Sequence, residues 1–164
     1  MNGNPIGPKT GNDSQYVHPP GMRGLLNWIS KRYNRPPIYV FENGVPCPDE
    51  NNLPRDLALK DVFKINFYKG YIENMLLAVL EDGVDVRAYF ARSLIDNFEW
   101  ADGYSVRYGL VYIDYTNNLT RYPKDSAYFY SALINATFEN GKNLSNQLDS
   151  FYSDAKRRSQ LLDI

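Results

Sequence analysis

The strongest constraint on the fold is the order of two short strand-like runs with a long helical segment between them. Residues 38–41 (IYVF) and 84–96 (VDVRAYFARSLID) are rich in β-branched and aromatic side chains, as strands are. Residues 59–82 separate the two runs and carry an apolar stripe at helical spacing. Strands that alternate with helices indicate an α/β fold built from parallel βα units. A parallel sheet of two strands leaves its faces uncovered, so we expect both strands to belong to a larger sheet.

Three further segments surround the first strand. Residues 1–15 are polar and rich in glycine, proline and asparagine, which predicts a flexible N-terminal arm. Residues 21–33 place apolar side chains at helical spacing and predict an amphipathic helix. Residues 46–56 contain several prolines and asparagines, and we expect a loop without regular structure there.

The C-terminal half continues with a predicted hairpin and a final helix. Residues 109–123 predict a β-hairpin that turns at Asn117 and Asn118, because asparagine tolerates the positive φ of a tight turn. Pro123 is expected to open the final helix, residues 123–134, since proline is favoured in the first turn. Residues 135–164 form a polar C-terminal tail whose scattered apolar residues could make one weak amphipathic helix.

The balanced charge and the scarcity of histidine and cysteine exclude several classes of function. The 164 residues carry a formal net charge of -1, so nothing favours a nucleic acid or an anionic membrane as partner. One histidine, His18, and one cysteine, Cys47, exclude histidine-dependent triads, an internal disulfide and a cysteine-based metal cluster. Carboxylates, aromatic rings and hydroxyls must therefore carry the chemistry, and we expect no metal site.

Two features bear on cellular location. The N-terminal residues lack the basic-then-apolar pattern of a signal peptide. Four Asn-X-Ser/Thr sequons are a weak indication of a secreted parent protein, and they lie at Asn12, Asn118, Asn135 and Asn143. The location therefore stays open at this point.

Acidic and aromatic side chains follow both predicted strands. The first strand ends on Glu42, and the second is followed by Asp96, Asn97, Glu99 and Trp100. Because the carboxyl ends of parallel strands share one edge of a sheet, we expect these side chains on one rim. Carboxylates accept hydrogen bonds from paired sugar hydroxyls, and an aromatic plane packs on the apolar face of a pyranose. The pattern predicts carbohydrate recognition.

Four segments give the chain a specific resemblance to a known family. The runs PPIYVFENG, INFYKGYIENMLLAVLEDGVDVRAYF, SLIDNFEWADGYSVRYGLVYIDY and RYPKDSAYFY follow one another within residues 16–134. With their Glu-Asn-Gly and Asn-Phe-Glu-Trp signatures they resemble the C-terminal third of glycoside hydrolase family 1, the β-glucosidase family of retaining enzymes. The resemblance implies a (β/α)8 TIM barrel. Residues 16–134 would be an incomplete barrel, holding its last two βα units and a β-hairpin.

The resemblance also implies roles for individual residues. Glu42 matches the catalytic nucleophile, which attacks the anomeric carbon and forms a covalent glycosyl-enzyme. Glu99 and Trp100 match the residues that bind the hydroxyls and the face of the non-reducing sugar. Tyr108 stands where the family usually has phenylalanine beside the same sugar. Phe98 is expected in the core, and the residues given turn or scaffold roles are Asn43, Gly44, Arg107, Asp114 and Lys124.

Two substitutions and one missing motif depart from the family pattern. Phe41 replaces a threonine and adds bulk beside the nucleophile. Arg92, in YFARSL, replaces the tryptophan on which the sugar stacks; a guanidinium can also stack, but it can pair with Glu42, so we expect weakened sugar binding. Retaining chemistry also needs a second carboxylic acid about 5–5.5 Å from the first. Two carboxylates suffice for the family's reaction, so the resemblance implies no cofactor. The Asn-Glu-Pro motif that supplies this acid in the family does not occur in the sequence.

Three functional hypotheses follow. In the first, the chain is the nucleophile-bearing part of a β-glucosidase-type O-glycosyl hydrolase of carbohydrate metabolism, weakly active or inactive alone on β-glucosides. In the second, it is a non-catalytic truncated fragment, an alternative-start product or a partial gene product, which folds partially, docks on another chain or has no function. The third and least favoured is a small carbohydrate-binding module, because half a pocket buries little of a sugar. Exposed sheet edges also predict self-association of the isolated chain.

Overall fold

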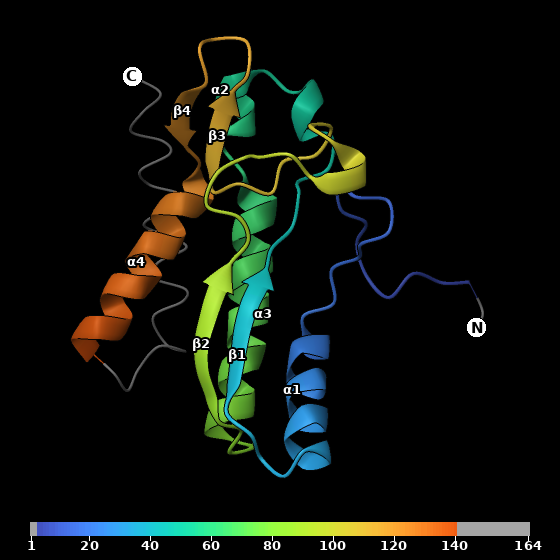
Figure 1. Cartoon of the computed structure of the whole chain (residues 1–164), viewed down its shortest axis with the longest axis vertical. Helices are drawn as coiled ribbons and strands as arrows, with labels where there is room; N and C mark the ends of the chain where they lie inside the picture. The colour runs from blue at the N-terminus through green and yellow to red at the C-terminus, as the bar shows by residue number, and fades with distance from the viewer. Residues whose placement is uncertain (1–2, 141–164) are drawn as a thin grey trace.

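A two-stranded parallel sheet covered on one face by two helices forms the centre of the molecule (Figure 1). The computed structural model describes residues 3–140, and side chains as far as residue 135. Strand β1 (Ile38–Asn43) pairs with β2 (Val86–Ala91) in parallel, as the alternation of strands and helices predicted. Helix α3 (Val62–Leu80) connects the two strands. Within the described residues neither outer edge of this sheet is paired, so the barrel is incomplete.

Successive side chains of a strand point to opposite faces of the sheet, and the helices cover only one of these faces. Helix α1 (Pro20–Arg32) lies beside α3, and the two helices pack on the same side of the sheet (Figure 1). Apolar side chains from both strands meet them there, and the cluster includes Met22, Leu26, Ile38, Val40, Ala78, Val84, Val86 and Tyr89. The opposite face is exposed and carries Tyr39, Phe41 and Phe90 as a stacked aromatic row.

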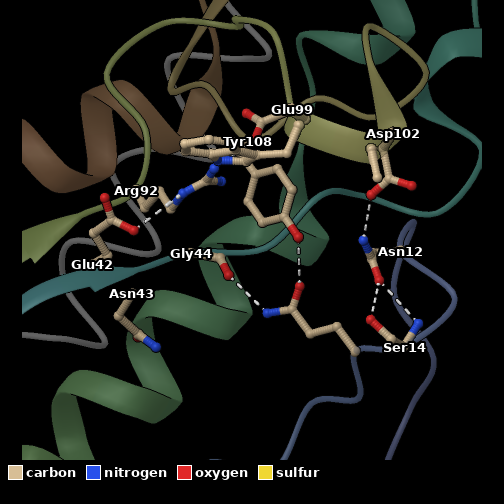
Figure 2. Close-up of a pocket in the computed structure, with 12 residues that line it drawn as sticks. Asn12, Ser14, Glu42, Asn43, Gly44, Arg92, Glu99, Asp102 and Tyr108 are labelled. Carbon is tan, nitrogen blue, oxygen red and sulfur yellow. Dashed lines mark hydrogen bonds and ion pairs between the residues drawn. The ribbon is translucent and has the colours of Figure 1, made fainter.

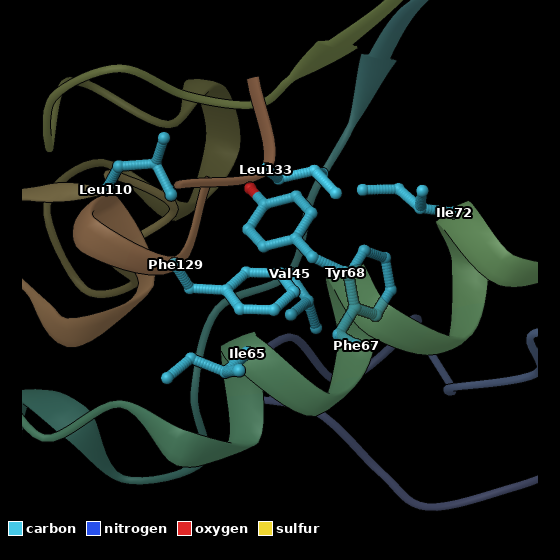
Figure 3. Packing of buried hydrophobic residues seen from close by; sticks show 8 residues of the cluster. All are labelled: Val45, Ile65, Phe67, Tyr68, Ile72, Leu110, Phe129 and Leu133. Atoms are coloured by element: carbon cyan, nitrogen blue, oxygen red, sulfur yellow. The ribbon is translucent and has the colours of Figure 1, made fainter. Parts of the chain in front are cut away.

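A second apolar cluster joins α3 to the C-terminal elements (Figure 3). Helix α4 (Asp125–Asn140) packs along α3, and the cluster between them contains Val45, Ile65, Phe67, Tyr68, Ile72, Leu110, Phe129 and Leu133. The hydroxyl of Tyr68 leaves this core to donate a hydrogen bond of 2.9 Å to the backbone carbonyl of Arg92. The core therefore fixes the carboxyl end of β2.

The predicted hairpin is present, but its turn and the start of the next helix differ from expectation. Strands β3 (Val111–Asp114) and β4 (Thr120–Pro123) pair in antiparallel register. Positive φ occurs at Asn118 and Leu119 rather than at both asparagines, because a longer loop joins the strands. Pro123 is the last residue of β4, so the prediction that it opens the helix was wrong. Its missing N–H is tolerated at the end of an edge strand.

The segment predicted to be an irregular loop contains two short helices. A 3-10 turn (Glu50–Asn52) and helix α2 (Arg55–Ala58) lie within it. Glu50 is buried and accepts a hydrogen bond from the ammonium of Lys124. This long-range pairing holds the segment against the fold, and its proline and asparagine content gave no sign of it.

The N-terminal arm packs against the chain that follows β1. Lys9 and Tyr16 form an antiparallel bridge, and the amide of Gly11 donates a hydrogen bond of 3.0 Å to the carbonyl of Pro46. A Cβ at Gly11 would lie 2.4 Å from the carbonyl oxygen of Cys47, so the close approach requires glycine. Prediction of a flexible arm did not anticipate these contacts.

At the other end, α4 continues to Asn140, six residues beyond residue 134, where the final helix was expected to end. The predicted weak helix of the tail lies outside the described residues. No helix in the part of the chain that the structure describes combines the length and apolar character that a membrane span requires.

Candidate active site

The residues predicted for the site from both strand ends line a common cavity of about 530 Å³ (Figure 2). It lies at the carboxyl ends of β1 and β2, and the predicted residues among its lining are Glu42, Arg92, Glu99, Trp100 and Tyr108. The indole of Trp100 is 80% exposed and forms part of the cavity wall. Of the residues expected on one rim, Glu42, Glu99 and Trp100 line this cavity, whereas Asp96 and Asn97 do not.

A β-bulge turns Glu42 toward the cavity. Between Val40 and Asn43, strand β1 has one residue more than the segment of β2 that faces it. Phe41 and Glu42 are consequently both exposed, whereas strict alternation would place Glu42 on the helix-covered face with Val40. Bulges next to active sites commonly re-aim a side chain in this way. The carboxylate of Glu42 is 74% exposed.

The ends of the two strands are held tightly together beside Glu42. The amide of Arg92 donates a hydrogen bond of 3.0 Å to the carbonyl of Asn43, and the hydroxyl of Tyr89 donates one of 2.7 Å to the Asn43 side chain. A Cβ at Gly44 would lie 1.7 Å from the carbonyl oxygen of Arg92. Only glycine fits there. The expected turn at Asn43 and Gly44 is absent: Asn43 is the last residue of β1, and Gly44 continues the chain without a turn because it packs closely against the backbone of Arg92.

The guanidinium of Arg92 lies between the two carboxylates of the cavity. Its Nε is 3.5 Å from Oε2 of Glu42, which is the pairing that the sequence suggested, but its Nη2 is only 2.5 Å from Oε2 of Glu99. Its Cζ lies 4.3 Å from the ring centroid of Tyr108. The side chain of Glu99 is 2% exposed, and its Oε1 has no hydrogen-bond partner among the described residues. A buried carboxylate oxygen of this kind suits a hydroxyl donor from a ligand.

Asp96 supports the site from below and does not lie on the rim where it was expected. It is buried and accepts hydrogen bonds from Arg107 Nη1 at 2.6 Å, from the amide of Gly109 at 3.0 Å and from Lys124. The amide of Ile113 donates a fourth hydrogen bond, of 3.2 Å. A buried carboxylate is normally satisfied by donors of this kind, and all four lie inside the fold, so Asp96 is buried with them. Arg107 and Lys124 have the scaffold roles predicted for them.

Phe98 was expected in the core, and that prediction was wrong. Its side chain is 59% exposed and contacts the edge of Tyr104, with ring centroids 5.5 Å apart. Asn97, next to it, folds back to donate hydrogen bonds to the Ser93 hydroxyl and the Ile95 carbonyl. With Asn97 held in this way and Glu99 directed inward, Phe98 faces outward.

The sequence did not indicate that the N-terminal arm contributes to the cavity wall. Asn12, Ser14 and Gln15 line it, and Asn12 Nδ2 donates a hydrogen bond of 2.7 Å to Asp102, which also lines the cavity. The closely spaced glycines of the arm were the available signal, because they permit close backbone approach. Within the described residues, no three acidic, histidine or cysteine side chains converge in a way that could hold a metal ion.

Acidic side chains and aromatic rings gather at the carboxyl ends of the parallel strands, which is where (β/α)8 barrel enzymes have their active sites. A family model, glycosyl hydrolase family 1, matches residues 1–139. The chain therefore belongs to glycosyl hydrolase family 1, and the match includes the N-terminal arm.

Individual relatives agree with this assignment. Beta-glucosidase 42 of Arabidopsis thaliana is 46% identical over 139 residues, a match that covers 85% of this chain and 28% of the relative. A GH1 β-glucosidase from Humicola insolens, crystallised in complex with glucose, has a TM-score of 0.79 at 47% identity, covering 82% of this chain and 28% of that one. A rice β-glucosidase mutant in a covalent complex with Glc has a TM-score of 0.77 at 46% identity, covering 80% and 27%. The chain thus spans little more than a quarter of the length of these relatives.

Proposed function

We propose that this chain carries the nucleophile side of a retaining β-glucosidase site. In this reaction a carboxylate oxygen of Glu42 forms a bond to the anomeric carbon, the bond from that carbon to the aglycone oxygen breaks, and the leaving oxygen takes the electron pair. The observation that carries the proposal is the position of Glu42: it is exposed near the carboxyl end of β1 and lines the cavity that also contains Glu99.

The other residues of the cavity are suited to hold the sugar ring. Oε1 of Glu99 can accept a hydrogen bond from a sugar hydroxyl, which would satisfy an oxygen that is otherwise buried without a partner. Trp100 offers an exposed aromatic plane, and Tyr108 with Arg92 offers a stacked surface. One structural relative is in complex with glucose and another in a covalent complex with Glc, which supports a β-glucoside as the substrate class. Arg92 in place of tryptophan is expected to weaken that binding.

Protonation of the leaving group is the step that this chain does not supply. The sequence has no Asn-Glu-Pro motif, and Glu99 is engaged by Arg92. Loss of a general acid typically costs about 10²–10⁴-fold in rate. We infer that the chain alone reacts with glucosides whose leaving group needs no proton and turns over ordinary β-glucosides weakly or not at all.

Covalent labelling tests the proposal without requiring the acid. A 2-deoxy-2-fluoro-β-glucoside with a dinitrophenolate leaving group should add one fluoroglucosyl group to the chain, detected by intact mass and located at Glu42 by peptide mapping. Glu42→Gln should abolish the label, whereas Glu73→Gln, an exposed glutamate on α3, should leave it unchanged. A label on any other residue, or none on the wild type, would contradict the proposal.

Exposed apolar surface favours the second hypothesis, a non-catalytic part that docks on another chain. The aromatic row Tyr39, Phe41 and Phe90 is exposed, and an apolar cavity of about 780 Å³ lies between α3, β2 and α4. Sedimentation velocity over a range of concentrations tests this reading. Self-association that falls when Phe41 is replaced by lysine would support it, and a monomer at every concentration would count against it.

A further inference from the structure

Gln15, from the N-terminal arm, connects two elements of the cavity (Figure 2). Its Nε2 donates a hydrogen bond of 2.9 Å to the carbonyl oxygen of Gly44, and its Oε1 accepts one of 3.0 Å from the hydroxyl of Tyr108. Gly44 lies two residues after Glu42 along the chain. Gln15 therefore ties the end of β1, which carries Glu42, to Tyr108, whose ring contacts the guanidinium of Arg92.

The chemistry of these groups fixes the direction of both hydrogen bonds. A backbone carbonyl can only accept, so the amide nitrogen of Gln15 must face Gly44 and its oxygen must face Tyr108. Burial raises the pKa of the Tyr108 hydroxyl above its ordinary value, so the hydroxyl keeps its proton and donates it. An ionised glutamate at this position could not donate to Gly44, and a leucine could make neither bond.

Tyr108 in turn supports Arg92. The guanidinium carbon lies 4.3 Å from the centroid of the Tyr108 ring, within the range of a cation–π contact. Nη2 of Arg92 is 2.5 Å from Glu99, but its Nε is 3.5 Å from Glu42. The arginine is thus held nearer to the buried carboxylate than to the exposed one, and Glu42 keeps most of its surface open.

We propose that Gln15 is a positioning residue for the nucleophile. By linking the Tyr108 hydroxyl to the Gly44 carbonyl through its own side-chain amide, it keeps Arg92 on Glu99 and away from close pairing with Glu42. When this tie is removed, the Tyr108 ring and Arg92 gain freedom, and Arg92 can close on Glu42 and make it less available for attack. The catalytic consequence rests on the proposed function, but the structural tie can be measured apart from it.

The tie is tested with Gln15→Leu, Tyr108→Phe and the double variant. The Nε–H signal of Arg92 in proton–nitrogen NMR spectra should move in the same direction in both single variants and no further in the double variant. The reason is that each single variant already removes the hydrogen bond from the Tyr108 hydroxyl to Gln15. Asp13→Asn, an exposed change on the same turn of the arm, is the matched control and should leave the signal in place. An Arg92 signal that does not move in Gln15→Leu overturns the proposal, whether or not the chain is catalytic.

The labelling rate with the activated fluoroglucoside tests the consequence for Glu42. Gln15→Leu removes two neutral hydrogen bonds and should slow labelling at least about two- to ten-fold, which is what one such bond is worth. Gln15→Glu should be labelled as slowly as Gln15→Leu at neutral pH. As the pH falls to about 4.3 the new carboxyl takes up a proton, and the acid form can again donate to Gly44. The labelling rate of Gln15→Glu should then approach that of the wild type measured at the same pH. A passive packing role would give no such pH signature.

The outcomes separate the two proposals. A wild type that is not labelled, together with an Arg92 signal that moves in Gln15→Leu, would refute the proposed function and leave the tie supported. A wild type that is labelled at Glu42, with Gln15→Leu labelled equally fast, would refute the positioning role and leave the function supported.

Discussion

Replacement of Arg92 by methionine should cost free energy of folding mainly through Glu99 and very little through Glu42. Glu99 is 2% exposed and makes a charge-assisted hydrogen bond of 2.5 Å, so removal of the guanidinium leaves a buried carboxylate unpaired. Breaking a fully buried pair costs about 3–5 kcal/mol, and a charge-assisted hydrogen bond is worth about 1.5–3 kcal/mol. Arg92 is 21% exposed, so water can partly replace it, and we expect a loss of about 2–3 kcal/mol.

The second partner of Arg92 provides the matched comparison. Glu42 is 74% exposed and lies 3.5 Å from the arginine, so Glu42→Gln should cost less than about 0.5 kcal/mol. The double variant Arg92→Met with Glu99→Gln should recover most of the loss from Arg92→Met alone, because it leaves no unpaired charge buried.

Urea unfolding followed by near-UV circular dichroism measures these differences as shifts of the midpoint at constant slope. The reasoning is refuted if Arg92→Met costs less than about 0.5 kcal/mol, since Glu99 would then not depend on it. It is also refuted if Glu42→Gln costs as much as Arg92→Met, or if the double variant is no more stable than the single one.

Other predictions follow from the same contacts. Gly44→Ala should destabilise the fold by about 1–3 kcal/mol, because the new methyl would lie 1.7 Å from a carbonyl oxygen; Gly24→Ala, in open space on α1, should stabilise it by about 0.5–1 kcal/mol in the same titration. Hydrogen bonds from Arg23 and Asn27 lower the pKa of Asp82 from 3.8 to about 2. The contribution of Asp82 to the free energy of unfolding is therefore fully present above pH 3.8 and is lost as the pH falls through 2. In Asp82→Asn, the free energy of unfolding should therefore fall less steeply than in the wild type as the pH is lowered from 3.8 to 2. An equally steep fall would contradict this. Burial raises the pKa of the Cys47 thiol to about 12, so a disulfide reagent near neutral pH should label it slowly in the native chain and rapidly in urea.

Elements whose signals are local were predictable from the sequence. Helices α1 and α3 and strands β1 and β2 carry apolar side chains at the spacing of their own structure, and alternation of strand and helix implied parallel pairing. Boundaries set by distant contacts were not predictable. Glu50 lies in a 3-10 turn because Lys124, far along the chain, pairs with it, and Pro123 ends a strand because β3 lies beside it.

The candidate site divides in the same way. By itself, the sequence placed Glu42 and Glu99 at the carboxyl ends of two parallel strands, because residue types and their order determine which strand each one follows. Only the tertiary structure decided that a bulge turns Glu42 outward, that Arg92 lies closer to Glu99 than to Glu42, and that Gln15 reaches the cavity. These features arise from strand register and from hydrogen bonds between residues far apart in the chain. Such contacts leave no periodic pattern in the sequence, because each depends on where the rest of the fold brings its partner.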